Sequence, residues 1–153
     1  MEFRDVKGKK IECPKDNDYL FRPAAYGILI KEKKLLLIKP NWDEKKYCLP
    51  GGSIEKGETI KESLIREFLE ETSYKIKVDE KPLFVDTQPF GNKEKDIYFQ
   101  RINLYFKVSL VSKTNKQLDS ETVEIVWKNF YNIKPLIFTY FQRKFIKKMI
   151  AKK

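Results

Sequence analysis

The stretch of sequence that decides the fold runs from residue 52 to residue 74 and reads GSIEKGETIKESLIREFLEETSY. Its second half has a helical pattern, because apolar residues recur every four positions from Ile60 to Phe68. Thr59 and Glu62 have the spacing of a capping box, in which each side chain accepts a hydrogen bond from the other residue's backbone N–H. The pattern therefore predicts a helix over residues 59–72.

Three glutamates gather on one face of this predicted helix. Glu67, Glu70 and Glu71 stand at positions i, i+3 and i+4, which lie on the same side of a helix. Three like charges held this close repel one another, so the cluster costs stability unless a cation relieves it. Carboxylate oxygens suit hard divalent ions, Mg²⁺ above all, without help from His or Cys. The spacing therefore predicts a divalent-metal site.

The loop in front of the helix adds two features. Gly51 and Gly52 provide a backbone without side chains, where a carbonyl oxygen can approach the same ion and a phosphate can come close. Glu58 lies eight residues before Arg66, and the carboxylate can pair with the guanidinium in a bidentate contact. Such a contact would tie the loop to the helix.

The segment from Gly52 to Tyr74 resembles the Nudix box. The pattern of that family is Gly, five residues, Glu, seven residues, Arg-Glu, an apolar residue, any residue, Glu-Glu, any residue, Gly and an apolar residue. Here the box positions are occupied by Gly52, Glu58, Arg66, Glu67, Phe68, Glu70, Glu71, Ser73 and Tyr74. Ser73 departs from the pattern, at a place where Gly usually supplies a left-handed helix cap. We expect Ser73 to adopt that conformation at a cost of about 1 kcal/mol.

The resemblance implies a fold and an activity. The fold would be an α/β/α sandwich with a mixed β-sheet over roughly residues 21–135. The activity would be hydrolysis of a pyrophosphate bond in a nucleoside diphosphate linked to another moiety, so that the partner is a small nucleotide. The approach to the box, Leu49-Pro50-Gly51-Gly52, and the later stretch from Glu121 to Trp127 are also similar to that family.

The same resemblance assigns roles residue by residue. The metal ligands would be the Gly52 carbonyl and the carboxylates of Glu67, Glu70 and Glu71. They would hold Mg²⁺, for which Mn²⁺ is a candidate substitute. Arg66 and Glu58 would brace the loop. Bound metal would bridge phosphate oxygens, neutralise developing charge and orient or activate the attacking water.

The composition narrows the chemistry further. Histidine is absent from the 153 residues, which excludes Ser-His-Asp and Cys-His catalysis and most zinc sites. The general base must therefore be a carboxylate, for which Glu67 is the candidate inside the box and Glu121 or Glu124 the candidates outside it. The predicted catalytic residues are Glu67, Glu70, Arg66 and Glu121.

Substrate contacts must come from outside the box. Trp42 and Tyr47 flank the approach to the two glycines, and their rings can stack on a nucleobase. Arg22 and Arg101 can meet phosphates. Core packing or a solvated charge is the competing explanation for each of these four side chains.

The rest of the chain predicts one domain over residues 1–153. Residues 1–20 are mixed and charged and predict an entry strand or arm. Two apolar runs, 24–30 and 35–38, are separated by a charged turn and predict a buried hairpin. Further strands are expected over 81–85, 97–111 and 123–127. Residues 136–150 carry an apolar stripe opposite lysines and predict an amphipathic C-terminal helix that covers the sheet.

The charge keeps a second function open. Lys plus Arg number 32 and Asp plus Glu 22, so the net charge is +10, which favours polyanionic ligands. An RNA 5′ pyrophosphohydrolase is therefore an alternative to an enzyme for small nucleotides. A third reading, motivated by Ser73, is a Nudix-like sensor that binds a nucleotide without cleaving it.

The sequence offers no membrane or secretory signal. No apolar run approaches the roughly 20 residues that span a bilayer, and the first ten residues, MEFRDVKGKK, lack the apolar stretch of a secretory signal. We expect a cytoplasmic protein without a membrane partner, and a homodimer is a candidate assembly. Cys13 and Cys48 lack metal-ligand spacing, and we expect both to be reduced thiols.

Overall fold

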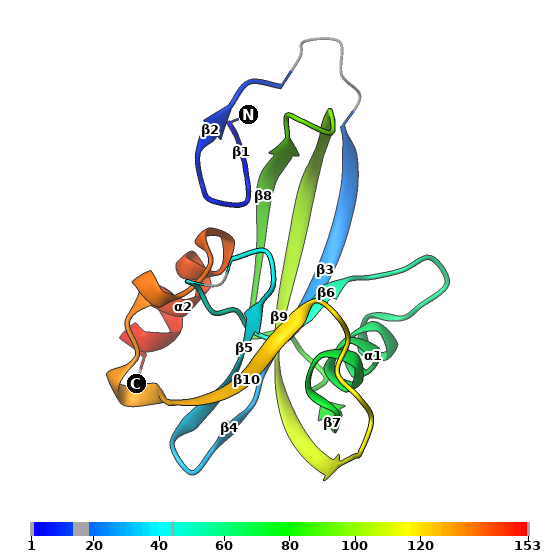
Figure 1. Cartoon of the computed structure of the whole chain (residues 1–153), viewed down its shortest axis with the longest axis vertical. Coiled ribbons are helices and arrows are strands. Elements are labelled where there is room, and N and C mark those ends of the chain that lie inside the picture. The colour runs from blue at the N-terminus through cyan, green and yellow to red at the C-terminus, as the bar shows by residue number, and fades with distance from the viewer. Residues whose placement is uncertain (1, 14–18, 44, 153) are drawn as a thin grey trace.

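A mixed β-sheet of seven strands forms the centre of the molecule. The computed structural model describes residues 2–13, 19–43 and 45–152, and Figure 1 shows their arrangement. The seven strands are β1 (Phe3–Arg4), β2 (Lys10–Ile11), β3 (Leu20–Ile28), β6 (Gly51–Ser53), β7 (Tyr74–Val78), β8 (Phe84–Asn92) and β9 (Ile97–Lys113). Their order is β2-β1-β8-β9-β3-β6, with β7 paired to the far end of β9. β3 runs parallel to β9 and β1 runs parallel to β8, whereas the pairs β3–β6 and β8–β9 are antiparallel, so the predicted mixed sheet is confirmed.

A second, smaller sheet is formed by the two strands that follow β3 and by one later strand. It consists of β4 (Ile30–Lys31), β5 (Lys34–Pro40) and β10 (Thr122–Asn129), in the order β10-β5-β4. The predicted hairpin between 24–30 and 35–38 is therefore wrong for most of its length. Only β4 pairs with β5, with Ile30 opposite Leu35, because the chain leaves the large sheet at the end of β3. Glu32 and Lys33 both have positive φ, as a tight two-residue turn requires.

The helix α1 (Ile60–Thr72) covers one face of the sheet, and its capping box at Thr59 is confirmed. Leu64 and Phe68 are fully buried on the side that faces the sheet, in a cluster with residues of β3, β5, β7 and β9. Gly27 in β3 permits this packing, since a Cβ there would lie 2.3 Å from Cε2 of Phe68. Of the predicted apolar stripe, Leu64 and Phe68 are therefore buried, whereas Ile60 at the start of the helix is 38% exposed.

The opposite face is covered by the C-terminal segment. Its helix, α2 (Arg143–Ala151), buries Phe145 and Ile146 in a second cluster, where the Phe145 ring stacks on Tyr105 of β9 at 4.2 Å between centroids. Figure 1 shows α1 and α2 on opposite sides of the sheet. The predicted α/β/α sandwich is therefore confirmed. Among the described residues, none of the helices has the length and apolar content that crossing a bilayer requires.

The C-terminal helix begins at Arg143, later than the predicted start at residue 136. Three short 3₁₀ turns precede it, η1 (Phe130–Asn132), η2 (Pro135–Ile137) and η3 (Tyr140–Gln142). Between η2 and η3 the chain is extended at Phe138 and pairs with Tyr47, which donates its N–H to Ile137 O and accepts from Thr139 N. This pairing with a distant segment interrupts the helix that the apolar stripe predicts.

Of the other predicted strands, two are confirmed and one has the wrong bounds. The strands expected over 97–111 and 123–127 correspond to β9 and β10, each somewhat longer than predicted. The strand expected over 81–85 is wrong in its bounds, because β8 begins only at Phe84 and continues to Asn92. Residues 1–20 contain strands as expected: β1 adds to the sheet beside β8, with Arg4 opposite Phe90.

Candidate active site

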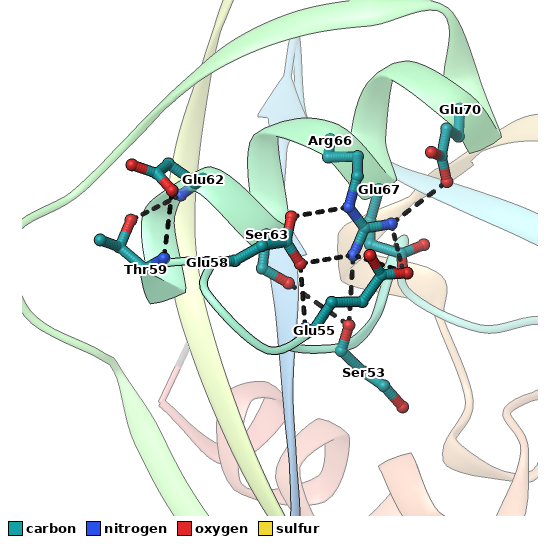
Figure 2. Close-up of polar contacts among 9 residues, drawn as sticks. All are labelled: Ser53, Glu55, Glu58, Thr59, Glu62, Ser63, Arg66, Glu67 and Glu70. Carbon is teal, nitrogen blue, oxygen red and sulfur yellow. Dashed lines mark hydrogen bonds and ion pairs between the residues drawn. The ribbon is translucent and has the colours of Figure 1, made fainter.

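The Arg66 guanidinium, in the middle of α1, is the centre of the polar cluster shown in Figure 2. Its Nε donates to Glu58 Oε2 at 2.7 Å and its Nη2 donates to Glu58 Oε1 at 2.9 Å, a bidentate contact. Nη2 also donates to the Ser53 carbonyl at 3.3 Å. The loop between β6 and α1 is therefore fixed to the helix at both ends of its course.

Electrostatics reinforce this contact. Hydrogen bonding from Arg66, helped by the backbone N–H of Glu55, lowers the pKa of Glu58 from 4.5 to about 2. The Glu58 carboxylate in turn raises the pKa of Arg66 above its ordinary value. The pair therefore stays ionised at neutral pH.

Two of the three box glutamates also contact Arg66. Its Nη1 donates to Glu67 Oε1 at 3.1 Å and to Glu70 Oε2 at 3.3 Å. Figure 2 shows both carboxylates on the same side of α1 as the guanidinium. Arg66 thus joins the loop carboxylate to the helix carboxylates and offsets part of their mutual repulsion.

Glu71 lies against the two glycines, which belong to strand β6 and pair with β3. Its side chain is buried, and its Oε1 accepts a hydrogen bond from Gly51 N at 2.7 Å. Burial raises the pKa of Glu71 well above its ordinary value, and the nearby charges of Glu67, Asp119 and Glu121 raise it further. Gly51 has φ of 141°, and a Cβ there would lie 2.1 Å from Ala25 O, so only glycine fits at the start of β6.

Glu67 lies against the second glycine. A Cβ on Gly52 would lie 2.9 Å from Glu67 Oε1, which shows how closely backbone and carboxylate approach. Burial raises the pKa of Glu67, the Arg66 guanidinium opposes that effect, and Glu70 and Asp119 add to it. The backbone of Gly52 and the carboxylates of Glu67 and Glu71 are therefore neighbours.

The donor set suits a hard divalent cation. All the candidate donors are oxygens, and Glu71, which is buried, and Glu67, which is partly buried, lie beside other acidic groups, an arrangement that a cation would stabilise. Across the part of the chain that the structure describes, however, no three acidic or thiol side chains already converge as a ready metal cage. Glu70 is turned to Arg66 and Glu71 to Gly51, so side-chain rotation must accompany binding.

The structure adds one acidic residue that sequence reasoning missed. Asp119 lies in the connection before β10, near enough to Glu67 and Glu71 to raise the pKa of both. The candidate base Glu121 is exposed and lies near Glu71, whereas Glu124 is paired with Lys39 at 3.9 Å. The signal for Asp119 was its place just before the predicted strand, but only the folded connection brings it to α1.

Among the described residues, no hydrogen bond or ion pair joins the four predicted substrate contacts to the box carboxylates, so their role stays a prediction. Arg22 and Arg101 are opposite each other on β3 and β9, and Arg101 Nη2 donates to Tyr26 OH at 2.9 Å. The ring of Tyr47 lies under Lys128 Nζ at 4.7 Å, while Trp42 is 50% exposed. The two arginines therefore form one basic pair on the sheet.

Comparison with known proteins shows the family. Residues 20–149 match the NUDIX domain, and the chain therefore belongs to the Nudix family.

Two curated relatives match about half of the chain. One, from Bacillus subtilis (strain 168), is named as a candidate 8-oxo-dGTP diphosphatase and is 35% identical over 75 residues, 45% of this chain and 50% of its own length. The other, an ADP-ribose pyrophosphatase of Methanocaldococcus jannaschii, is 44% identical over 73 residues, 46% of this chain and 43% of its own length. This chain thus aligns with about half the length of each curated relative.

Solved structures share the fold. A NUDIX hydrolase from Nitrosomonas europaea superposes with a TM-score of 0.68 at 19% identity, covering 94% of this chain and 79% of that one. At this identity the likeness concerns the fold alone.

Proposed function

We propose that this chain is a Mg²⁺-dependent Nudix hydrolase that cleaves the pyrophosphate bond of a small nucleotide. The observation that carries the proposal is the arrangement along α1. The buried Glu71 and the partly buried Glu67 lie beside Gly51-Gly52, while Arg66 joins the Glu58 carboxylate to Glu67. A group of carboxylates beside a strand segment without side chains suits a cation and a phosphate together.

The proposed roles follow from these positions. Gly52 O and the carboxylates of Glu67, Glu70 and Glu71 would hold the cation through oxygen atoms alone, because histidine is absent and Cys48 is buried. When bound, Mg²⁺ would neutralise charge on the phosphate oxygens and lower the pKa of water. Arg66 and Glu58 keep the loop in place, and Glu67 or Glu121 accepts the proton of the attacking water.

The relatives support a nucleotide as substrate. Both curated names, 8-oxo-dGTP diphosphatase and ADP-ribose pyrophosphatase, describe cleavage of a nucleotide's phosphoanhydride bond. The adjacent Arg22 and Arg101 give this chain a basic pair that can receive phosphates. A panel of nucleotides determines which nucleobase the enzyme prefers.

A substrate panel tests the proposal. Purified protein is incubated with Mg²⁺ and nucleoside triphosphates, ADP-ribose or dinucleoside polyphosphates, and released phosphate, pyrophosphate and nucleoside monophosphate are measured. We expect turnover of at least one compound and its loss with EDTA. Absence of turnover throughout the panel, together with a nucleotide-induced rise in melting temperature, would instead favour the non-catalytic sensor.

A specific surface favours RNA 5′ ends as a second candidate substrate. A hollow of about 440 Å³ beside β8 is lined by Arg4, Arg143, Lys144 and Lys147, and also by Gln88. Gln88 stands opposite Arg101 in the sheet, and Arg101 stands opposite Arg22, so a row of polar side chains crosses β8, β9 and β3. Phosphodiester groups could follow this row toward β6.

Salt dependence tests the RNA candidate. Binding of a 5′-triphosphorylated oligonucleotide should weaken steeply with salt, and Lys144→Ala/Lys147→Ala should weaken it more than Lys75→Ala/Lys77→Ala, which removes the same charge from β7. Weak binding that does not change with salt concentration, or equal effects of the two double variants, would exclude RNA 5′ ends as the substrate.

Two further expectations belong to this proposal. We propose that residues 1–153 act as one Nudix domain, supported by the pairing of β1 with β8 and by the burial of Phe3 against Tyr98. A homodimer stays a prediction, which light scattering after size-exclusion chromatography tests.

A further inference from the structure

Ser73, the departure from the box pattern, makes more contacts than a helix cap needs. It has the left-handed conformation expected there, with φ 65° and ψ 12°, and its N–H bonds Leu69 O at 3.1 Å. In addition, its hydroxyl donates to Lys116 O. Its carbonyl accepts from Thr114 N at 2.9 Å and from Thr114 Oγ1 at 2.8 Å. The end of α1 is therefore bound to the connection that leads into β10.

That connection, residues 114–121, lies along the end of the helix. Asp119 N donates to Glu70 O at 2.9 Å, and Asp119 Oδ1 accepts from Thr122 N at 3.0 Å. At its far end, Asn41 N donates to Glu121 O at 2.9 Å. The segment is thus bonded to Ser73, to Glu70 and to Asn41. Asp119 is the residue that bonds to Glu70.

The Ser73 hydroxyl is what glycine would lack. Glycine adopts the left-handed cap at no steric cost, whereas serine is strained there. Serine keeps, in exchange, a side-chain hydrogen bond to the 114–121 segment that no glycine can form. The hydrogen bond from Asp119 N to Glu70 O places this segment against the part of α1 that carries Glu67, Glu70 and Glu71, so the Ser73 bond holds a segment that reaches the acidic site.

We propose that Ser73 is a positioning residue whose hydroxyl, through Lys116, holds the 114–121 segment so that Asp119 completes the acidic group formed by Glu67 and Glu71. The inference rests on the proposed metal site. Asp119 adds negative charge at that site, and the affinity of oxygen-ligand sites for divalent ions rises with the charge of the ligands. Ser73 touches neither substrate nor metal and acts through Asp119.

Ser73→Gly separates the hydroxyl from the cap. The glycine keeps the helix end and removes only the hydrogen bond to Lys116, so the melting temperature should stay the same or rise. Mn²⁺ affinity, measured by electron paramagnetic resonance, should fall about two- to tenfold, as expected for the loss of one hydrogen bond. If Ser73 were merely an imperfect cap, Mn²⁺ affinity would not fall, and that result overturns the inference.

A double-mutant cycle tests the route through Asp119. Asp119→Asn should weaken Mn²⁺ binding, and Ser73→Gly should have little further effect in that background. Glu94→Gln is the control, since it removes the same charge from the exposed turn between β8 and β9. Equal effects of Asp119→Asn and Glu94→Gln, or full additivity in the cycle, overturn the inference. Absence of Mn²⁺ binding by the unmodified protein would instead overturn the proposed function.

Discussion

Arg66 holds Glu58 through two hydrogen bonds, of 2.7 Å from Nε and 2.9 Å from Nη2. Lysine keeps the charge at this position but lacks the planar fork that makes such a contact. We expect Arg66→Lys to lower kcat/KM by about 10- to 100-fold, as loss of a group that orients metal ligands typically does. Steady-state kinetics on any substrate that the panel identifies measures this.

The control for Arg66→Lys is a helix cap that lies outside the acidic site. Thr59→Ala removes the side chain that accepts from Glu62 N, and it should cost about 1 kcal/mol of unfolding free energy while kcat/KM is retained. If both variants lose activity in proportion to their lost stability, Arg66 has a structural role only.

Stability should depend on pH through Glu58. Its pKa is about 2 in the folded protein against 4.5 for the unfolded reference, so the folded protein binds fewer protons between these values. Its contribution is therefore complete above pH 4.5 and is lost as the pH falls from about 4.5 toward 2. Urea unfolding over this range should show a shallower decline in Glu58→Gln, and an identical decline would contradict the assignment.

Metal binding should be linked to proton release. Burial raises the pKa of Glu67 and Glu71, so protons compete with a cation for these two carboxylates. Mn²⁺ affinity should rise with pH until both are ionised, and calorimetry in buffers of different ionisation enthalpy should detect released protons. An affinity for Mn²⁺ that does not change with pH would contradict this linkage.

The same two carboxylates affect the stability of the metal-free protein. Their raised pKa values mean that the folded state binds more protons than the unfolded chain above pH 4.5, so the free energy of unfolding should fall with rising pH there.

Removal of one helix carboxylate tests the metal ligands directly. Glu70→Gln keeps the shape of a side chain that is only partly buried, so the fold should persist. Losing a metal ligand should remove several kcal/mol of transition-state stabilisation, which corresponds to a decrease of roughly 100- to 1000-fold in kcat. Circular dichroism checks the fold, and a folded Glu70→Gln enzyme with normal activity would exclude Glu70 as a ligand.

The local parts of this structure were predictable from sequence. The helix, its capping box and the Glu58 to Arg66 contact depend on residues fewer than ten positions apart, where backbone geometry fixes which side chains meet. The likeness to the Nudix box supplied the rest of the architecture, since periodicity alone does not order the strands.

Long-range pairing explains the failures. Residues 24–30 and 35–38 are close in sequence, yet β3 pairs with β9 and β5 pairs with β10 along most of their lengths. The stripe over 136–150 is helical only from Arg143, because Phe138 pairs with Tyr47. Asp119 reaches α1 through a hydrogen bond to Glu70 O, a contact between residues with 48 positions between them. No local pattern encodes such partners.

The packing of α1 on the sheet yields a last prediction, at Gly27. A Cβ there would lie 2.3 Å from Cε2 and 2.8 Å from Cζ of Phe68, and Phe68 is fully buried. Gly27→Ala should therefore destabilise the protein by about 1–3 kcal/mol, the usual cost of overpacking, as measured by urea unfolding. Phe68→Leu removes both ring atoms in contact, so it should make Gly27→Ala less harmful than it is alone. Additive losses in the double variant would show that the two residues do not compete for this space.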